Sequence, residues 1–175
     1  SHGDARKAID LFRGAGDLAD ERGEEIVTEE HVRESQEEID KDRSLKLVEG
    51  LTTQKKISLY ATAAVAYHSN WTGSSVPSPV GFKIYQWVTN ELDADQMTRE
   101  TYVKYVKELS TYGLISTSRK SRGRGGGMYM EFTFTSDPEA MMARIVGDTR
   151  LEAITQQKEL LSSVVNVQLN EFHEK

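Results

Sequence analysis

Apolar side chains recur at helical spacing through the first third of the chain. Residues 4–22 place them about every third or fourth position, which predicts a helix that ends at Gly23. Thr28 is a suitable N-cap for a second helix that continues into the charged stretch 33–43, which we interpret as a solvated helix or a linker. Leucines and a valine in residues 44–51 predict a further short helix.

The middle of the chain has the pattern of a compact helical core. Residues 54–67, 81–92 and 99–112 each carry enough regularly spaced apolar side chains to predict a buried helix face. Residues 69–80 are rich in Ser, Pro and Gly, which predicts a loop. Thr98 is the expected N-cap of the third of these helices.

The hydrophobic period then changes from that of a helix to that of a strand. Residues 114–118 are strand-like, and residues 128–135 alternate between two faces, which predicts two strands joined by the segment RKSRGRGGG. Asp137 and Pro138 are suited to start another helix. A helix expected in residues 151–172 can dock on its own domain or on another copy.

The order of these elements predicts the fold class. Residues 54–135 run helix, helix, helix, strand, basic hairpin, strand, which is the order of a winged helix-turn-helix. We therefore expect a mainly α protein with one β-hairpin, preceded by a shorter helical segment.

The net charge of −6 by itself argues against a nucleic-acid partner, but the charge is distributed unevenly along the chain. Residues 1–50 hold 8 basic and 15 acidic side chains, and residues 136–175 hold 4 and 7. Residues 51–135 hold 10 basic and 6 acidic side chains, so the positive charge lies in the predicted winged helix. Such a local basic region favours DNA as the partner even in an acidic protein.

Several other classes of protein have no support in the sequence. The chain has no cysteine, and its 4 histidines are not spaced as zinc ligands. No apolar run is long enough for a membrane span, so we expect a cytoplasmic, nucleoid-associated protein. No local grouping of nucleophile, base and acid suggests an enzyme, although a site built from distant residues stays open.

The helix at 99–112 is the expected DNA-reading element. The major groove is about 12 Å wide and admits one helix, whose N-terminal residues approach the base edges. Those residues are Thr98, Arg99, Thr101 and Tyr102, and the first amides of the helix favour a phosphate. Arg99 can instead form a surface ion pair with a neighbouring glutamate, and Tyr102 can instead belong to the core.

The tip of the hairpin is the second expected contact. It consists of small and basic residues, namely Arg119, Lys120, Arg122, Gly123, Arg124 and Gly125. The glycines let the backbone approach the duplex, and arginines at the tip suit the negative potential of a narrow minor groove. Arg119 and Lys120 are better placed for phosphates. The alternative is a solvated loop that binds nothing.

Three segments resemble the archaeal replication initiators, which are AAA+ proteins related to the origin-recognition and cell-division-control subunits. The segment GDARKAIDL at residues 3–11 is similar to the start of the last lid helices in that family. The segment IVTEEHV at 26–32 and the wing SRGRGG at 121–126 are also similar to theirs. The likeness extends over residues 3–150.

The resemblance implies a domain plan and a function. It implies lid helices over 1–43, a winged helix over 44–150 and a helical tail over 151–175. It also implies sequence-specific binding of double-stranded origin DNA and a role in helicase loading, with the helicase and other initiator copies as candidate partners. Arg6 matches the arginine that senses nucleotide in the intact protein, which uses ATP and Mg²⁺.

The chain departs from the family pattern because it has no Walker A lysine loop and no Walker B strand. We therefore expect no cofactor in this chain and no enzymatic activity of its own. The competing hypothesis for function is a module that binds a protein partner, with residues 82–92 and 151–172 as its interface.

Overall fold

The computed structural model describes residues 2–69, 75–123 and 126–174. Its contacts divide the chain into two compact units, Ser1–Ser44 and Leu45–Lys175. The boundary falls within helix α2, Glu29–Glu49. Among the described residues, no helix combines the length and the apolar character that a membrane span needs.

The first unit consists of α1, His2–Glu21, and the first part of α2. The two helices meet closely at Gly14, where an added Cβ would lie well inside van der Waals distance of the Ser35 hydroxyl. That hydroxyl donates a hydrogen bond to the Leu11 carbonyl at 3.0 Å. The absent side chain at Gly14 therefore permits a helix-to-helix hydrogen bond.

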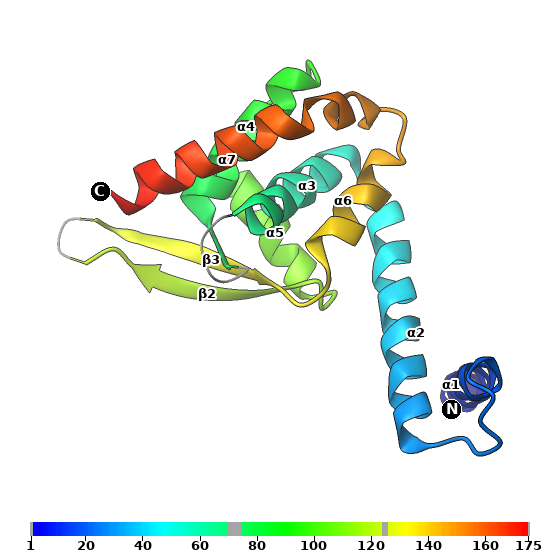
Figure 1. The fold of residues 1–175 in the computed structure, drawn as a ribbon. Coiled ribbons are helices and arrows are strands. Elements are labelled where there is room, and N and C mark those ends of the chain that lie inside the picture. The colour runs from blue at the N-terminus through cyan, green and yellow to red at the C-terminus, as the bar shows by residue number, and fades with distance from the viewer. Residues whose placement is uncertain (1, 70–74, 124–125, 175) are drawn as a thin grey trace. The chain divides into compact units, whose positions relative to one another are not determined.

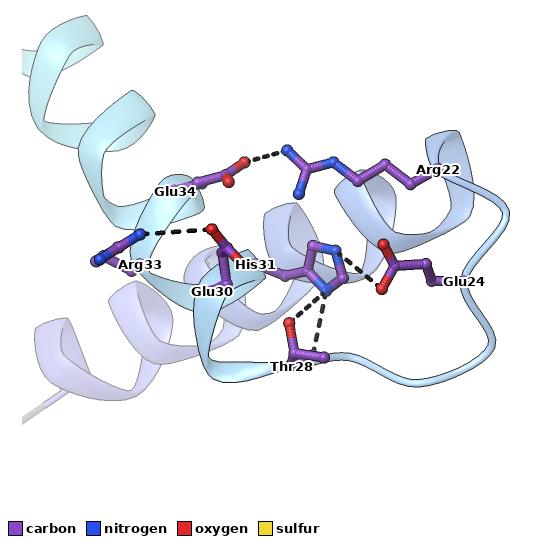
Figure 2. A network of polar contacts seen from close by, with 7 residues as sticks. All are labelled: Arg22, Glu24, Thr28, Glu30, His31, Arg33 and Glu34. Atoms are coloured by element: carbon purple, nitrogen blue, oxygen red, sulfur yellow. Dashed lines mark hydrogen bonds and ion pairs between the residues drawn. The ribbon is translucent and has the colours of Figure 1, made fainter.

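A polar network fixes the start of α2 (Figure 2). The buried His31 accepts a hydrogen bond from the Thr28 amide through Nδ1 at 3.1 Å, and its Nε2 lies 3.7 Å from Glu24. A side chain in the first turn that reaches back to the amide of the residue before the helix makes one of the two hydrogen bonds of a capping box, here with histidine in place of the usual glutamate. Arg22 forms an ion pair with Glu34 beside it.

Helix α2 is a correction to the sequence prediction. The expected short helix at 44–51 is not separate, because α2 runs without interruption to Glu49. The stretch 33–49 contains no Gly or Pro, and its Glu, Lys, Arg and Leu residues all favour helix. Gly50 is the first helix-breaking residue after it.

The second unit is built around α3, Thr53–His68, which is buried from Lys56 to Val65. It contacts α4, Ser78–Glu91, and α5, Arg99–Ser110, as well as the later helices. These three helices are the ones predicted from the sequence. Their buried apolar side chains form one continuous core with those of the sheet and the later helices.

A three-stranded antiparallel sheet completes the core, in the order β1-β3-β2. Strands β2, Ile115–Ser121, and β3, Met128–Phe134, pair from Ile115↔Phe134 to Ser121↔Met128, which confirms the predicted hairpin (Figure 1). Phe132 and Phe134 are buried, as the alternation predicted.

Strand β1, Ser75–Pro77, was not predicted, because the sequence indicated a loop over 69–80. It pairs with β3 through Val76↔Phe132 and its neighbours. A three-residue strand that ends in proline is too short to show an alternation of apolar and polar residues. The Ser78 hydroxyl accepts a hydrogen bond from the Met130 amide at 3.1 Å, which extends the pairing past the proline.

The remaining elements return along the helical core. Helix α6, Pro138–Val146, begins as predicted, with the Asp137 carboxylate accepting a hydrogen bond from the Glu139 amide at 2.9 Å. A 3₁₀ segment, Glu152–Gln157, leads into α7, Lys158–His173. Leu161, Val165 and Leu169 of α7 are buried, so this helix docks on its own domain.

Where α4 crosses α5, there is room only for a glycine at position 81. A Cβ added to Gly81 would lie far inside van der Waals distance of the Tyr102 hydroxyl. We predict that Gly81→Ala lowers the free energy of unfolding by about 1–3 kcal/mol, as overpacking in a core does. Chemical denaturation followed by tryptophan fluorescence would measure this, because Trp87 of α4 lies in the second unit.

Two controls separate this clash from a general effect of alanine. In Gly50→Ala the added Cβ would meet only the Leu47 carbonyl, at 3.7 Å, so stability should hardly change. In a Tyr102→Phe background the clashing hydroxyl is gone, so Gly81→Ala should cost less than in the wild type. An equal cost in both backgrounds would contradict the prediction.

A buried ion pair joins α3 to the end of α6. Lys56 Nζ lies 2.9 Å from Asp148 Oδ2, and the two side chains are only 9% and 12% exposed. Arg150 also donates to Asp148, at 2.8 and 3.0 Å. The Arg150 and Lys56 hydrogen bonds hold the pKa of Asp148 well below its ordinary value.

This carboxylate should therefore make stability depend on pH. A carboxyl group with a lowered pKa stabilises the fold fully above its unfolded-state pKa of about 4, and this stabilisation is lost as pH falls further. We predict that Asp148→Asn is less stable than wild type at pH 7 and that the difference shrinks below about pH 4. Asp95→Asn, at an exposed position, is the matched control.

Candidate nucleic-acid interface

The start of α5 is held by side chains from the helical core. The Tyr85 hydroxyl donates to Gln54 Oε1 at 2.8 Å and accepts from the Met97 amide at 3.0 Å. Gln54 Nε2 donates to the Asp95 carbonyl at 2.8 Å. These bonds tie the turn before α5 to α3 and α4, so the first residues of α5 have a fixed position.

Thr98 is the N-cap of α5, as the sequence predicted. Its hydroxyl accepts a hydrogen bond from the Thr101 amide at 3.3 Å and lies 3.1 Å from the Thr101 hydroxyl. Thr98 and Arg99 are exposed, and Thr101 is half-buried. All three are therefore accessible at the end of the helix that was expected to read DNA.

Tyr102 corrects the predicted set of contact residues. It is fully buried, and its hydroxyl lies 2.8 Å from that of Thr62 on α3. Because the Thr62 hydroxyl donates to the Ser58 carbonyl, Tyr102 is the donor in this pair. Burial raises the pKa of Tyr102, and its ring packs against Phe82, Tyr85 and Phe132. It is a core residue, with no surface to offer to DNA.

A glutamate occupies the N-terminal end of α5 where a phosphate was expected. The Glu100 backbone amide and the Thr98 side chain lower the pKa of the exposed Glu100 carboxyl. A carboxylate in the first turn of a helix competes with a phosphate for the positive end of the helix. The side chains of α5, rather than its first amides, are then its main means of contacting a polyanion.

The outer side of α5 carries cations that the sequence analysis did not single out. Lys104 and Lys107 are exposed, whereas Val106 and Leu109 are buried. The helical period would have placed these lysines opposite the apolar positions. Glu108, the other acid on this helix, forms an ion pair with Lys55 of α3 at 2.8 Å.

The hairpin presents further cations. Arg119 and Lys120 are exposed near the end of β2, and Lys120 Nζ lies 3.6 Å from Glu131 of β3. Gly123 and Gly127 have φ values of 84° and 74°, which favour glycine. The Arg122 amide donates to the Gly127 carbonyl at 3.0 Å. Arg124 and Gly125 lie outside the described residues.

Arg122 does not project from the tip as expected. Its guanidinium donates a hydrogen bond to the Phe172 carbonyl at the end of α7, and it stacks on the Phe172 ring at 3.6 Å from the centroid. The side chain is half-buried as a result.

Candidate cofactor ligands are few in the described part of the chain. No group of three or more His, Asp or Glu side chains is placed to hold a metal ion there. Arg6, the expected nucleotide sensor, is exposed on α1.

Three helices followed by a paired β-hairpin, with the third helix capped and basic on its outer side, define a winged-helix protein. Residues 46–144 match the family described as the CDC6 C-terminal winged helix domain, and residues 1–37 match the Cdc6 AAA+ ATPase-type lid domain. The chain belongs to the Cdc6 family of replication proteins, and it contains the lid and winged-helix parts of such a protein.

Similar relatives include archaeal replication proteins. The chain is 77% identical to the ORC1-type DNA replication protein 5 of Halobacterium salinarum, and the match covers 99% of this chain and 41% of the relative. It is 52% identical to the ORC1-type DNA replication protein 14 of Haloarcula marismortui, with the same coverage, 99% and 41%. The chain thus spans about two fifths of the length of these relatives.

A solved structure shares the fold. It is that of the Aeropyrum pernix ORC1 protein in complex with DNA, with a TM-score of 0.69 and 27% identity. The match covers 86% of this chain and 38% of that one.

The cap of α5 gives a testable prediction. Thr98→Ala removes the hydroxyl that satisfies the Thr101 amide, so it should lower the free energy of unfolding by about 1 kcal/mol. Thr98→Ser keeps the hydroxyl and should retain most of the stability. Denaturant titration compares the two, and equal losses in both variants would contradict a capping role.

Proposed function

We propose that this chain binds double-stranded DNA at replication origins in a sequence-specific manner. In this proposal α5 enters the major groove and the hairpin β2–β3 contacts the adjacent minor groove. The observation that carries the proposal is the placement of charge. Residues 99–127 contain 7 basic and 2 acidic side chains in a chain whose net charge is −6.

The two acids within this segment do little to cancel the basic surface. Glu108 is paired with Lys55 of α3, and Glu100 is the other acid among 7 basic side chains. The exposed cations therefore face solvent in excess over anions on both α5 and β2. A phosphate backbone is the partner that such a surface attracts most strongly.

Each contact residue then has a separate role. Arg99 can form two hydrogen bonds with a guanine edge, and Thr98 and Thr101 can contact a phosphate or a thymine methyl group. Arg119 and Lys120 neutralise phosphates beside the minor groove, where Gly123, Arg124 and Gly125 allow the tip to come close. The similar protein from Aeropyrum pernix, which was solved in complex with DNA, supports DNA as the partner.

We propose a larger role for a full-length protein like the relatives described above. There, Arg6 would reach the phosphates of ATP bound with Mg²⁺ by an ATPase domain, and the complex would help to load the replicative helicase. We place this in the cytoplasm, at the nucleoid.

Fluorescence anisotropy with an inverted-repeat origin duplex and a scrambled duplex, each at two salt concentrations, tests the proposal. Arg119→Ala with Lys120→Ala should weaken binding to both duplexes. It should also reduce the slope of the logarithm of the binding constant against the logarithm of the salt concentration by about two, because about one counterion is released per phosphate contact. Arg99→Ala should also reduce the preference for the origin duplex by about 1–3 kcal/mol.

The matched control is Lys41→Ala with Arg43→Ala, which removes two exposed cations from α2 instead. It should leave both affinities near those of the wild type. If the hairpin variant and Arg99→Ala bind as the wild type does, the proposal is wrong. Binding to a helicase subunit without binding to DNA would instead support the protein-interaction hypothesis.

A further inference from the structure

We propose that the last turn of α7 is a brace that sets the position of the wing, with Arg122 acting as a positioning residue that binds Phe172 rather than DNA. This inference rests on the proposed function for its consequence in DNA binding. Its structural part concerns only contacts between α7 and the hairpin.

The brace contacts both strands at the base of the hairpin tip. Arg122 directly follows β2, and its guanidinium lies over the Phe172 ring, 3.6 Å from the centroid. Tyr129, near the start of β3, meets the edge of the same ring, with the centroids 5.3 Å apart. One aromatic side chain of α7 therefore contacts the chain as it enters the tip and as it leaves.

The polar part of the contact matches the chemistry of a helix end. The carbonyls of the last turn of a helix lack partners within the helix and carry partial negative charge. The Arg122 guanidinium donates to one of them, the Phe172 carbonyl. A cation that both stacks on a ring and binds a helix C-terminus is held from two directions.

The body of α7 is fixed, so it can serve as a support. Leu161, Val165 and Leu169 are buried in the core, and Asn166 donates to the His68 carbonyl of α3 at 3.1 Å. Figure 1 shows α7 running above the hairpin of β2 and β3.

The ion pair of Lys83 with Glu171 near this end is 3.9 Å long, and its side chains are 58% and 50% exposed, so it contributes little. A hollow lined by Pro79, Lys83, Arg122, Gln168 and Phe172 lies between α4, α7 and the hairpin. Helix α4 contacts the hairpin farther from the tip, where the Met130 amide donates to Ser78, and the Phe172 contact lies nearer to the tip. The matched family segment, 46–144, ends before α7, so the brace lies outside that match.

The first experiment needs no DNA. Amide hydrogen exchange, followed by mass spectrometry, should be about threefold to tenfold faster in the 119–130 segment of Phe172→Ala than in wild type, as expected for the loss of a stacked cation. Exchange in the α3 core should not change. Val167→Ala, which truncates a side chain of α7 that is 52% exposed, is the matched control and should behave as the wild type.

The second experiment measures duplex affinity by anisotropy. Phe172→Ala and Arg122→Ala should each weaken binding by about threefold to tenfold, and the double variant should be no weaker than Arg122→Ala alone, because both changes break one contact. Arg122→Lys keeps the charge but not the flat stacking surface, so it should resemble Arg122→Ala.

The outcomes distinguish the two proposals. Unchanged exchange in Phe172→Ala would overturn the brace, as would tighter DNA binding by that variant or additive losses in the double variant. Wild-type affinity in Arg122→Lys would likewise overturn it, because Arg122 would then act through its charge. If wild type binds no duplex, the proposed function fails while the exchange measurement still decides whether α7 braces the wing.

Discussion

The close crossing of α4 and α5 is the constraint on which the arrangement of this domain depends. Gly81 has no side chain, and this absence lets the Tyr102 hydroxyl enter the core and reach Thr62 on α3. The same tyrosine ring contacts Phe132 of β3, so one residue joins three helices to the sheet. The buried contacts of Tyr102 on the inner side of α5 therefore determine the direction in which its exposed side faces.

Much of the fold could be predicted from the sequence, because most elements carry a clear period. The helices around the core show regular apolar spacing, and β3 alternates cleanly. Two features of the fold could not be predicted from the sequence. Strand β1 is too short to show a period, and its pairing with β3 depends on residues more than fifty positions away. The continuity of α2 was missed because a charged stretch is equally compatible with a linker until its contacts are known.

The candidate interface was predicted in outline, and its errors have one physical origin. Tyr102 and Arg122 are both amphipathic, with a large flat group and a polar end. Local sequence cannot decide whether such a side chain faces solvent or another part of the protein. In both cases the partner, Thr62 or Phe172, is distant in sequence. Lys104 and Lys107, by contrast, could have been found from the helical period alone.

The order of the strands has a consequence for the solubility of the protein. With β3 in the centre of the described sheet, β2 is an edge strand whose outer backbone groups could pair with a strand from another molecule. Arg119 and Lys120 lie on that edge. Two such strands brought together would place like charges side by side, so these cations also discourage the edge-to-edge association that leads to aggregation.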